Sequence, residues 1–377
     1  MLTGVKRLFS ARLQLSYLLV FASILSTTSR AEPRPCNSAI RSLMGPSLDD
    51  VSAGPKRAIE EIPQLRFGTY NTYNLMQSAD GKYLKPDDKR RGVAAPILEN
   101  DLDVIVLQEV ENIKSIQDFS RDYLKDRYTV MSSVGNDERG IQVAFLVKKD
   151  LPFKFELETH ADTKALYPVT GEETKVFSRD LPALRIWSTS QQSSSEDPLV
   201  VFYGTHFKSK RDKPGDPESR ILRRVQVETA SQIMKKDMNE HPSTLFMIAG
   251  DFNGDVRNDF EFASLRDTLK DAFDVAEKKP SPEDRITHTF HPKEGRAQRS
   301  QIDAFFVGED KAAYIEEAFV HRYKNADGSV RKIPETWNER NLNPSDHFPV
   351  ILKMNFRELL EQRGVLIPAP SLPRIAA

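Results

Sequence analysis

The stretch Leu-Phe-Met-Ile-Ala-Gly-Asp-Phe-Asn at residues 245–253 decides the fold. Its apolar run Leu245–Ala249 predicts a strand that is buried on at least one full face. Asp251 and Asn253 follow directly after this run. Such an ending is by itself only a turn, because Asp, Asn and Gly all favour turns. The same kind of ending recurs elsewhere in the chain, and the repetition makes it informative.

Further apolar runs of the sequence adjoin the same few kinds of polar side chain. They are Leu65–Tyr70 with Asn71, Val104–Leu107 with Glu109, Leu199–Tyr203 with His206, Ile302–Val307 with Asp303, and Pro349–Met354 with Asp346 and His347. Each polar residue alone has an ordinary explanation, since an acidic residue suits the first turn of a helix and a single histidine is most often a structural one. If the ends of these strands meet at one edge of the sheets, all of these polar side chains lie in one cleft. We favour that interpretation for the polar residues taken together.

The rest of the sequence alternates short apolar runs with helix-like stretches and shows no repeat of fixed length. Further strands are predicted at Ile141–Val147 and Ala183–Trp187, and helices at Asp87–Glu99, Ile113–Leu124 and Glu218–Met238. Because no break in composition divides this region, it predicts one α/β layered domain over residues 62–357. The Ser- and Gln-rich run Ser188–Ser195 predicts an exposed hairpin turn, and residues 358–377 are expected to be irregular.

The N-terminus has the pattern of a secretory signal peptide. Basic residues precede an apolar stretch, Leu13–Leu25, and small residues follow it up to Ala31. The stretch is shorter than the roughly 20 apolar residues of a membrane-spanning helix, which disfavours a short anchor. We expect residues 1–31 to direct export to the periplasm or the cell exterior and residues 32–61 to form a leader. The mature protein is expected to be a monomer without stable membrane insertion, and its single cysteine, Cys36, excludes an intramolecular disulfide.

Composition and charge exclude several classes of protein. Hydrophobic residues make up 39% and charged residues 29% of the chain, which is enough for a core and too mixed for disorder, collagen or a coiled coil. The formal net charge is −1, and it becomes −5 when residues 1–31 are left out. That balance does not suit a protein that coats nucleic acid through bulk charge. A phosphate-bearing substrate would have to be held locally, by a few basic groups or a metal.

The side chains at the strand ends favour a hard cation. Carboxylates occur there without cysteine and without a His-x-x-x-His pair, so that Mg²⁺ fits better than zinc, with Mn²⁺ and Ca²⁺ as alternatives. An asparagine donates to a phosphoryl oxygen without adding charge. A histidine beside an aspartate carries protons near neutral pH. This set of groups points to chemistry on a phosphoric ester.

At these residues the chain resembles the endonuclease/exonuclease/phosphatase superfamily, over roughly residues 65–356 and in the family's motif order. The motifs are Thr69-Tyr70-Asn71, Leu107-Gln108-Glu109, Gly204-Thr205-His206-Phe207-Lys208-Ser209, Gly250-Asp251-Phe252-Asn253, Gln301-Ile302-Asp303 and Ser345-Asp346-His347-Phe348-Pro349-Val350. The resemblance implies a deoxyribonuclease-like four-layer α/β sandwich, in which two packed mixed sheets are flanked by helices. It also implies metal-dependent hydrolysis at phosphorus, with water attacking in line.

The resemblance assigns a metal-binding group and a histidine pair. Glu109 corresponds to the main metal ligand, with Asn71 beside it and Asp346 in support of the metal or its water network. His347 corresponds to the histidine at the scissile phosphate, and Asp303 to the residue that orients it.

The remaining roles implied by the resemblance concern water and the phosphoryl group. Asp251 corresponds to the residue that positions or activates the attacking water, and Asn253 to the donor to a phosphoryl oxygen. His206 matches a histidine that the deoxyribonuclease branch uses near the leaving oxygen. An acidic residue orients that histidine in the same branch, and Glu138 is the candidate here, although a charged turn explains Glu138 equally well.

Nucleic acid is the favoured substrate. Lys208 and Lys210 begin a basic loop beside His206, and Arg179 is a further candidate for contact with a phosphate backbone. The segment Arg322–Pro344, with five basic residues and Trp337, is a candidate lip against a nucleic-acid strand. Fold analogy does not select the ester, so a phospholipid, sphingomyelin or inositol-phosphate esterase remains an alternative. A non-catalytic binding module is a third possibility, and the complete set of acidic residues and histidines argues against it.

Overall fold

The central strands of the protein are buried on both faces, and successive residues alternate between two cores. The computed structural model describes residues 56–76, 84–189, 197–292 and 296–365. In strand β9 (Val200–His206), Val200 and Phe202 face the core between the sheets, whereas Val201 and Tyr203 face a second core under helix α3 (Arg220–Glu240). This period of two follows from the pleat of a strand, and it explains why the sequence shows continuous apolar runs here.

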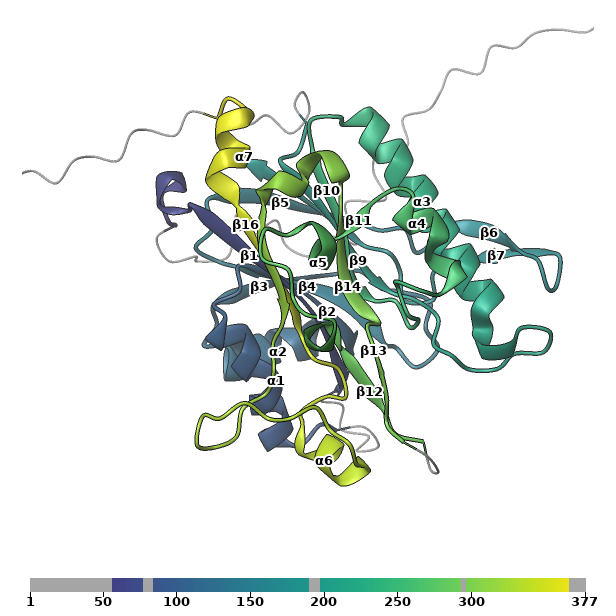
Figure 1. Cartoon of the computed structure of the whole chain (residues 1–377). Helices are drawn as coiled ribbons and strands as arrows, with labels where there is room; N and C mark the ends of the chain where they lie inside the picture. Colours follow the sequence, from purple (N-terminus) through teal and green to yellow (C-terminus); the bar gives the residue numbers. More distant parts are fainter. Residues whose placement is uncertain (1–55, 77–83, 190–196, 293–295, 366–377) are drawn as a thin grey trace, which may run out of the picture. The chain divides into compact units, whose positions relative to one another are not determined.

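Two six-stranded mixed sheets form the centre of the fold (Figure 1). The first has the order β15 (Ile315–Val320), β16 (Val350–Asn355), β1 (Gln64–Leu75), β2 (Val104–Val110), β4 (Gln142–Lys148) and β3 (Tyr128–Ser132). The second has the order β11 (Lys270–Asp271), β14 (Asp303–Val307), β10 (Leu245–Asp251), β9, β8 (Ala183–Ser188) and β5 (Phe153–Glu158). One parallel pair occurs in each sheet, β1 with β2 and β9 with β10, and the other pairs are antiparallel.

The sheets pack face to face through aromatic side chains. Phe202 of β9 meets Phe67 of β1 and Phe145 of β4 edge-on, with ring centroids 5.7 and 5.2 Å apart. Gly204 allows this close approach, because a Cβ there would lie 2.6 Å from a methyl group of Val106 in β2. Close packing of the two inner faces holds the strand ends of both sheets in fixed relation.

Helices cover the outer faces of the two sheets. Helices α1 (Asp87–Glu99) and α2 (Ile113–Tyr123) contact the first sheet, while α3, with α4 (Ala263–Arg266), covers the second. The remaining helices are α5 (Ala272–Val275), α6 (Trp337–Leu342) and α7 (Phe356–Gln362), and two ribbons are formed by β6 (Lys164–Tyr167) with β7 (Glu172–Lys175) and by β12 (His288–Phe290) with β13 (Gln298–Ser300). The predicted four-layer α/β sandwich is confirmed.

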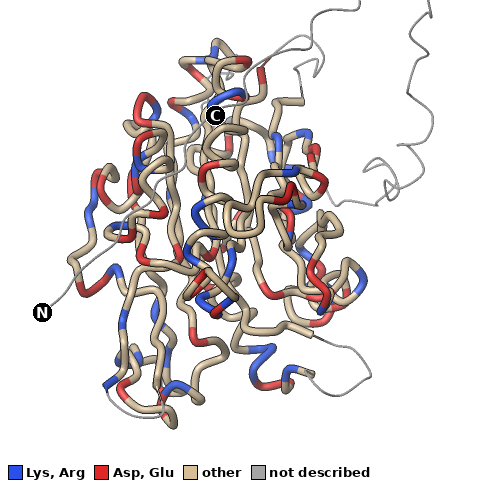
Figure 2. The backbone as a smooth tube through the Cα atoms, turned by 90° about the vertical axis from the view of Figure 1, so that its right-hand side faces the viewer, with Lys and Arg blue, Asp and Glu red and all other residues tan. Residues whose placement is uncertain are grey.

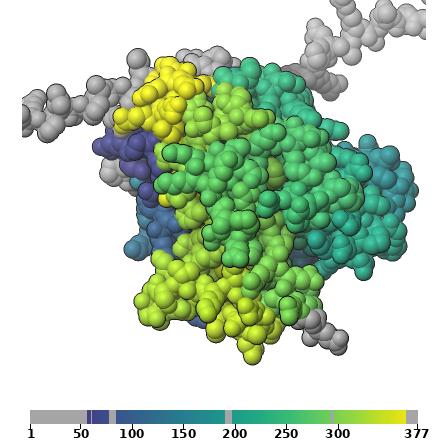
Figure 3. Space-filling model, viewed as in Figure 1, coloured from purple at the N-terminus to yellow at the C-terminus, as the bar shows by residue number. Residues whose placement is uncertain are grey.

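Residues from the second half of the chain, green to yellow, make up most of the face of the molecule drawn in Figure 3. Along the backbone, basic and acidic residues are interspersed rather than separated by sign (Figure 2). This mixing agrees with the near-neutral charge of the sequence. Among the described residues, no helix has the length and apolar character needed to cross a membrane.

The predicted strands are present, but most of them extend further than the apolar runs. β1, β2, β9 and β10 continue into the polar residues, so that Asn71, Glu109, His206 and Asp251 are strand residues and not the first residues of loops. α1 has the predicted bounds. α3 begins two residues later than predicted, because Glu218 and the residue after it have positive φ angles of 53° and 49°.

One prediction near the end of the domain is wrong in part. Residues 358–362 were expected to be irregular, yet they belong to α7, where Phe356 and two leucines are buried. Residues at the end of the predicted leader are packed on the domain, since Arg57 forms ion pairs with Asp103 and Asp150. The signal peptide, Cys36, residues 190–195 of the predicted hairpin turn and residues 366–377 lie outside the described residues.

Candidate active site

The ends of the two parallel strand pairs supply the polar groups of the site. In the first sheet, Asn71 of β1 lies opposite Gln108, the residue before Glu109 in β2. In the second sheet, His206 of β9 lies opposite Asp251 of β10. The carboxyl ends of parallel strands meet at the same edge of a sheet, and the packing of the two sheets brings both edges together.

Asp251 is the centre of the resulting hydrogen-bond network. Its Oδ2 accepts hydrogen bonds from Nδ2 of Asn71 at 2.9 Å and from Nδ2 of Asn253 at 3.1 Å. The same oxygen lies 3.5 Å from Nε2 of His206 and 3.9 Å from Nε2 of His347. Side chains from both sheets therefore converge on one buried carboxylate.

His347 is held by Asp303, as the resemblance implied. Nδ1 of His347 lies 2.8 Å from Oδ2 of Asp303, which is the first residue of β14 and pairs with Asp251 across the sheet. The backbone N–H of His347 donates to the hydroxyl of Ser345 at 3.1 Å. These contacts fix both the ring and its backbone, and they leave Nε2 directed toward Asp251.

The two histidines at Asp251 have pKa values shifted in opposite directions. Burial lowers the pKa of His347, but the charges of Asp303 and Asp251 outweigh burial and raise it to about 10. Burial lowers the pKa of His206 well below its usual 6.5, and the charge of Arg179 lowers it further. At neutral pH His347 is therefore a proton donor and His206 a proton acceptor. Pairs of groups whose surroundings push their pKa values apart are typical of acid–base catalysis.

Glu109 reaches the site from an irregular point of β2. The pairing register of β2 shifts between Gln108 and Val110, and Glu109 between them has a positive φ of 59°. A bulge of this kind redirects a side chain, and strained backbone is often found at functional sites. Burial and then the charge of Asp346 raise the pKa of Glu109, while the charge of His347 lowers it. The charges of the histidine site therefore act on Glu109. Oε2 of Glu109 accepts a hydrogen bond from the backbone N–H of Asn74 at 3.0 Å.

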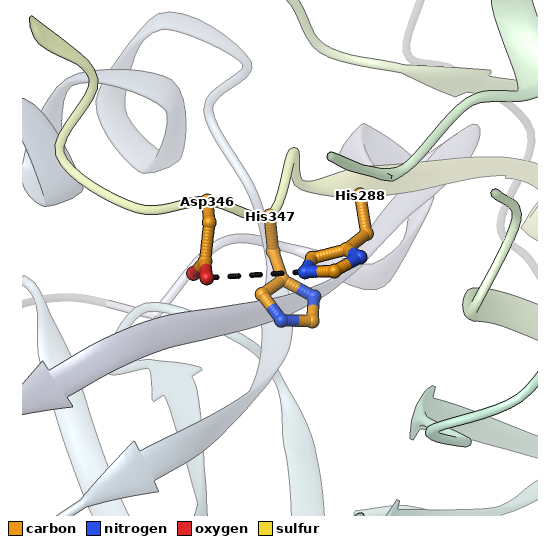
Figure 4. A group of neighbouring side chains, drawn as sticks. All are labelled: His288, Asp346 and His347. Atoms are coloured by element: carbon orange, nitrogen blue, oxygen red, sulfur yellow. Dashed lines mark ion pairs between the residues drawn. The ribbon is translucent and has the colours of Figure 1, made fainter. Parts of the chain in front are cut away.

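Asp346 has partners that the sequence did not reveal. Its Oδ2 lies 2.6 Å from Nη2 of Arg340 and 3.8 Å from Nε2 of His288. Figure 4 shows His288 beside His347, and the two ring centroids are 4.6 Å apart. His288 comes from the β12–β13 ribbon, which joins the segment before β16 through a bridge between His288 and His347. A single histidine in Thr-His-Thr gave no signal for this long-range contact.

The residues present fit a divalent cation. Oδ1 of Asp346 and Oδ1 of Asp303 are buried, and neither has a hydrogen-bond partner among the described residues. Burial and the charge of Asp303 raise the pKa of Asp251, and that of Glu109 is also raised, so the crowded carboxylates would gain from a positive charge. Carboxylate oxygens of Asp251 and Asp303 lie within 4.8 Å of each other, beside the ring of His347. Carboxylate-rich donor sets of this kind suit a hard cation.

The predicted phosphate-contacting residues are placed differently from one another. Arg179 is buried and donates a hydrogen bond to the carbonyl of Phe207 at 3.2 Å. Burial lowers the pKa of Arg179, and the charges of Glu109 and Asp251 raise it. Lys208 is half-buried, and the charge of Arg179 contributes to lowering its pKa after the effect of burial. Lys210 is exposed and lies 3.7 Å from Asp259, away from the Asp251 network.

The expected pairing of Glu138 with His206 is not observed. Glu138 is exposed, and Nδ1 of His206 has no hydrogen-bond partner in the part of the chain that the structure describes. The neighbouring Asp137 instead lies 3.1 Å from Nε of Arg179. The acidic turn before β4 therefore orients the arginine and not the histidine.

Comparisons with known proteins agree with this geometry. The family model described as Endonuclease/Exonuclease/phosphatase family matches residues 70–287. Truncated TDP2 from Caenorhabditis elegans is similar in structure, with a TM-score of 0.53 and 17% identity over 77% of this chain and 97% of that chain. An endonuclease/exonuclease/phosphatase family protein from Bacteroides thetaiotaomicron has a TM-score of 0.52 and 17% identity over 77% and 94% of the two chains.

A third similar structure is TDP2 from D. rerio in complex with a single-strand DNA product, with a TM-score of 0.50 and 16% identity over 77% of this chain and 98% of that chain. Identities this low show likeness of fold alone. No curated protein matches the sequence. Because the family match covers more than half of the 377 residues, the chain belongs to the endonuclease/exonuclease/phosphatase family of metal-dependent phosphoesterases.

Proposed function

We propose that the protein is an exported, metal-dependent phosphodiesterase that hydrolyses phosphodiester bonds within nucleic acid, and thus an endonuclease. The observation that carries the proposal is the buried network in which Asp251 lies between His206 and His347, two histidines of opposite protonation. A site that hydrolyses an ester in line needs an acceptor for the proton of water and a donor to the leaving oxygen. The network holds both.

Each residue of the network has a distinct task in this mechanism. Asp251 orients the attacking water, and neutral His206 accepts its proton, a role that differs from the place near the leaving oxygen implied by the resemblance. Protonated His347, held by Asp303, gives a proton to the leaving oxygen or neutralises a phosphoryl oxygen. Asn253, which has a positive φ of 54°, donates to a phosphoryl oxygen as charge develops there.

Mg²⁺ is the proposed cofactor, with Mn²⁺ or Ca²⁺ as substitutes. Glu109, Asn71 and Asp346 would hold it. When bound, the ion supplies Lewis-acid neutralisation of charge on the phosphoryl oxygens. Arg179 and Lys208 would steady the neighbouring backbone phosphates, whereas the position of Lys210 beside Asp259 suits a more distant contact.

Nucleic acid is the favoured substrate, because Arg179 and Lys208 place positive charge beside the site although the net charge of the chain is near zero. The fold of D. rerio TDP2, which was crystallised with a single-strand DNA product, is similar. Export through residues 1–31 and a monomeric state are parts of the same proposal. They are tested by the compartment in which the full chain accumulates and by light scattering of the purified protein.

The test of the activity uses supercoiled plasmid, RNA and sphingomyelin, each with Mg²⁺, Mn²⁺ or Ca²⁺ and with EDTA. We expect EDTA-sensitive nicking of the plasmid and a loss of ~10²–10⁴-fold for Asp251→Asn. Asp267→Asn is the matched control, because Asp267 is an exposed aspartate at the end of α4. Cleavage of sphingomyelin alone, or plasmid nicking that persists in EDTA, would contradict the proposal.

A further inference from the structure

A hollow of ≈ 370 Å³ adjoins the candidate active site at Asp346. Its walls come from three separate parts of the chain: Tyr73 near the end of β1, Lys85 just before α1 with Lys89 in its first turn, and Arg340 in α6. The mechanism proposed above uses none of these four residues. The hollow shares Asp346 with the site, so a ligand in it would lie directly beside the reacting ester.

The walls of the hollow are cationic. Lys85 is only 6% exposed, and its Nζ donates to the carbonyl of Tyr73 at 2.8 Å. Lys89 donates to the carbonyl of Asn343 at 3.1 Å. Backbone carbonyls satisfy the hydrogen bonds of these lysines but do not cancel their charge. An anion would be stabilised here.

The mutual effects of the charges support this description. Burial lowers the pKa of Lys85 to about 8. The charges of Lys89 and Arg340 also lower this pKa, whereas the charges of Asp346 and Glu109 raise it. Burial and the charges of two arginines also lower the pKa of Lys89. Like charges brought together in this way favour the binding of a negative group.

Tyr73 lines the hollow, and Trp337 lies next to it, on the far side of Arg340. The guanidinium of Arg340 lies over the rings of Tyr73 and Trp337, 4.4 and 4.8 Å from their centroids. Tyr73 is nevertheless 40% exposed and Trp337 55% exposed. Exposed aromatic rings beside a cationic groove are suited to stacking with nucleobases.

We propose that the hollow binds a second phosphate of the substrate, one unit away from the ester that is cut, and that Tyr73 and Trp337 stack against the base attached to it. The proposal rests on the proposed function for its role in turnover and narrows the substrate to a chain of at least two linked phosphates. A second phosphate also occurs in polyol phosphates. The rings of Tyr73 and Trp337 favour a nucleotide as its source.

The first experiment measures binding by calorimetry in EDTA, where no ester is cut. The probes are thymidine 5′-monophosphate, inositol monophosphate and inorganic phosphate, and the protein is the full chain. We expect Lys89→Ala to weaken binding of all three about tenfold, which corresponds to the loss of one charge-assisted hydrogen bond. Trp337→Ala should weaken binding of the nucleotide alone.

Controls for this experiment come from the same chain. Lys332→Ala removes an exposed lysine that does not line the hollow, so this variant should bind the nucleotide like the wild type. Circular dichroism and the melting temperature check the fold of each variant. Unchanged nucleotide binding in folded Lys89→Ala would overturn the proposal. Equal binding of inositol phosphate, with no effect of Trp337→Ala, would overturn the nucleotide assignment.

The second experiment separates this proposal from the proposed function. It compares bis(p-nitrophenyl) phosphate, which has one phosphate, with a dinucleotide that carries a second phosphate. Lys89→Ala should lower kcat/KM for the dinucleotide about tenfold more than for the simple diester. If the protein cuts neither ester but binds the nucleotide through Lys89, the proposed activity fails and the hollow remains a nucleotide site. Equal losses of kcat/KM on both esters would contradict a second-phosphate site.

Discussion

At the scale of single residues, the opposite protonation of His206 and His347 is the feature that determines the chemistry. We expect kcat/KM to fall at low pH as His206 takes up a proton, and to fall again near pH 10 as His347 loses one. Asp303→Asn removes the charge that raises the pKa of His347. This variant should move the alkaline limb to lower pH and reduce the rate at its optimum by ~10²-fold.

A pH–rate profile of wild type and Asp303→Asn checks this assignment. Asp255→Asn serves as a control, because the hydrogen bonds of Asp255 lie within the turn after β10 and do not involve either histidine. If the alkaline fall in kcat/KM occurs at the same pH in Asp303→Asn as in the wild type, His347 is not the group whose deprotonation causes it. His347→Ala should lose activity by ~10²–10⁴-fold with its fold preserved.

Carboxylate crowding at Glu109 has a consequence for stability. Burial and neighbouring carboxylates raise the pKa of Glu109, so Glu109→Gln should raise the melting temperature in EDTA by removing an unfavourable charge. Mg²⁺ should stabilise the wild type by about 2.7 kcal/mol at a concentration of 100 Kd. Glu109→Gln should lose most of this gain, as seen by calorimetry with Asp267→Asn as the control. An undiminished Mg²⁺ effect in Glu109→Gln would place the cation elsewhere.

At the scale of elements, the contact between β9 and β10 fixes the position of Asp251. A Cβ on Gly250 would lie 1.9 Å from the carbonyl oxygen of Thr205, a backbone atom of the neighbouring strand β9. Gly250→Ala should therefore cost on the order of 3 kcal/mol of unfolding free energy and displace the carboxylate. Urea denaturation measures the cost. Gly171→Ala, on the open β6–β7 turn, is the comparison, because there only the positive φ of 71° opposes a Cβ and no atom lies within 4 Å. Equal stability of the two variants would contradict the close approach.

A buried carboxylate at the edge strand β11 makes stability depend on pH. Burial raises the pKa of Asp271 to about 6, although hydrogen bonds from the backbone of Phe273 and the side chain of Gln301 lower it. The folded state then binds a proton more tightly than the unfolded state. The contribution of Asp271 is fully present below about pH 4 and is lost as the pH rises through about 6.

Asp271→Asn should consequently stabilise the protein at pH 8 by about 2 kcal/mol and by much less at pH 4. Thermal denaturation at the two pH values measures the difference. Asp267→Asn is a suitable control, because Asp267 is an exposed aspartate outside α5. A stabilisation that is the same at both pH values would mean that Asp271 does not titrate between them.

The elements that the sequence predicted are those with the clearest apolar pattern. The strands buried on both faces show continuous apolar runs, and α1 has the bounds predicted for it. β15 was missed because its pattern Ile-Glu-Glu-Ala-Phe-Val does not alternate regularly. β5 was also missed, although Phe-Lys-Phe-Glu-Leu-Glu alternates strictly and could have been recognised.

At the scale of the whole molecule, local sequence could identify the site but not its detailed contacts. Asn71, Asp251 and His347 were found because each adjoins a buried strand, and packing of the sheets brings them together. The contact of His288 with Asp346 depends on a bridge between segments far apart in sequence. Arg340 is near Asp346 in sequence, but it reaches Asp346 only because α6 presents its guanidinium there. The bulge at Glu109 likewise depends on pairing with β4 and has no local signature.

The central claim is that residues from both sheets act as one catalytic unit, and a double-mutant cycle on plasmid nicking in Mg²⁺ tests it most directly. Asp251→Asn and His347→Ala should each lower kcat/KM by ~10²–10⁴-fold. Because groups that act together are not additive, the double variant should be about as active as the worse single variant. Losses that multiply in the double variant would contradict a single site shared by the two sheets.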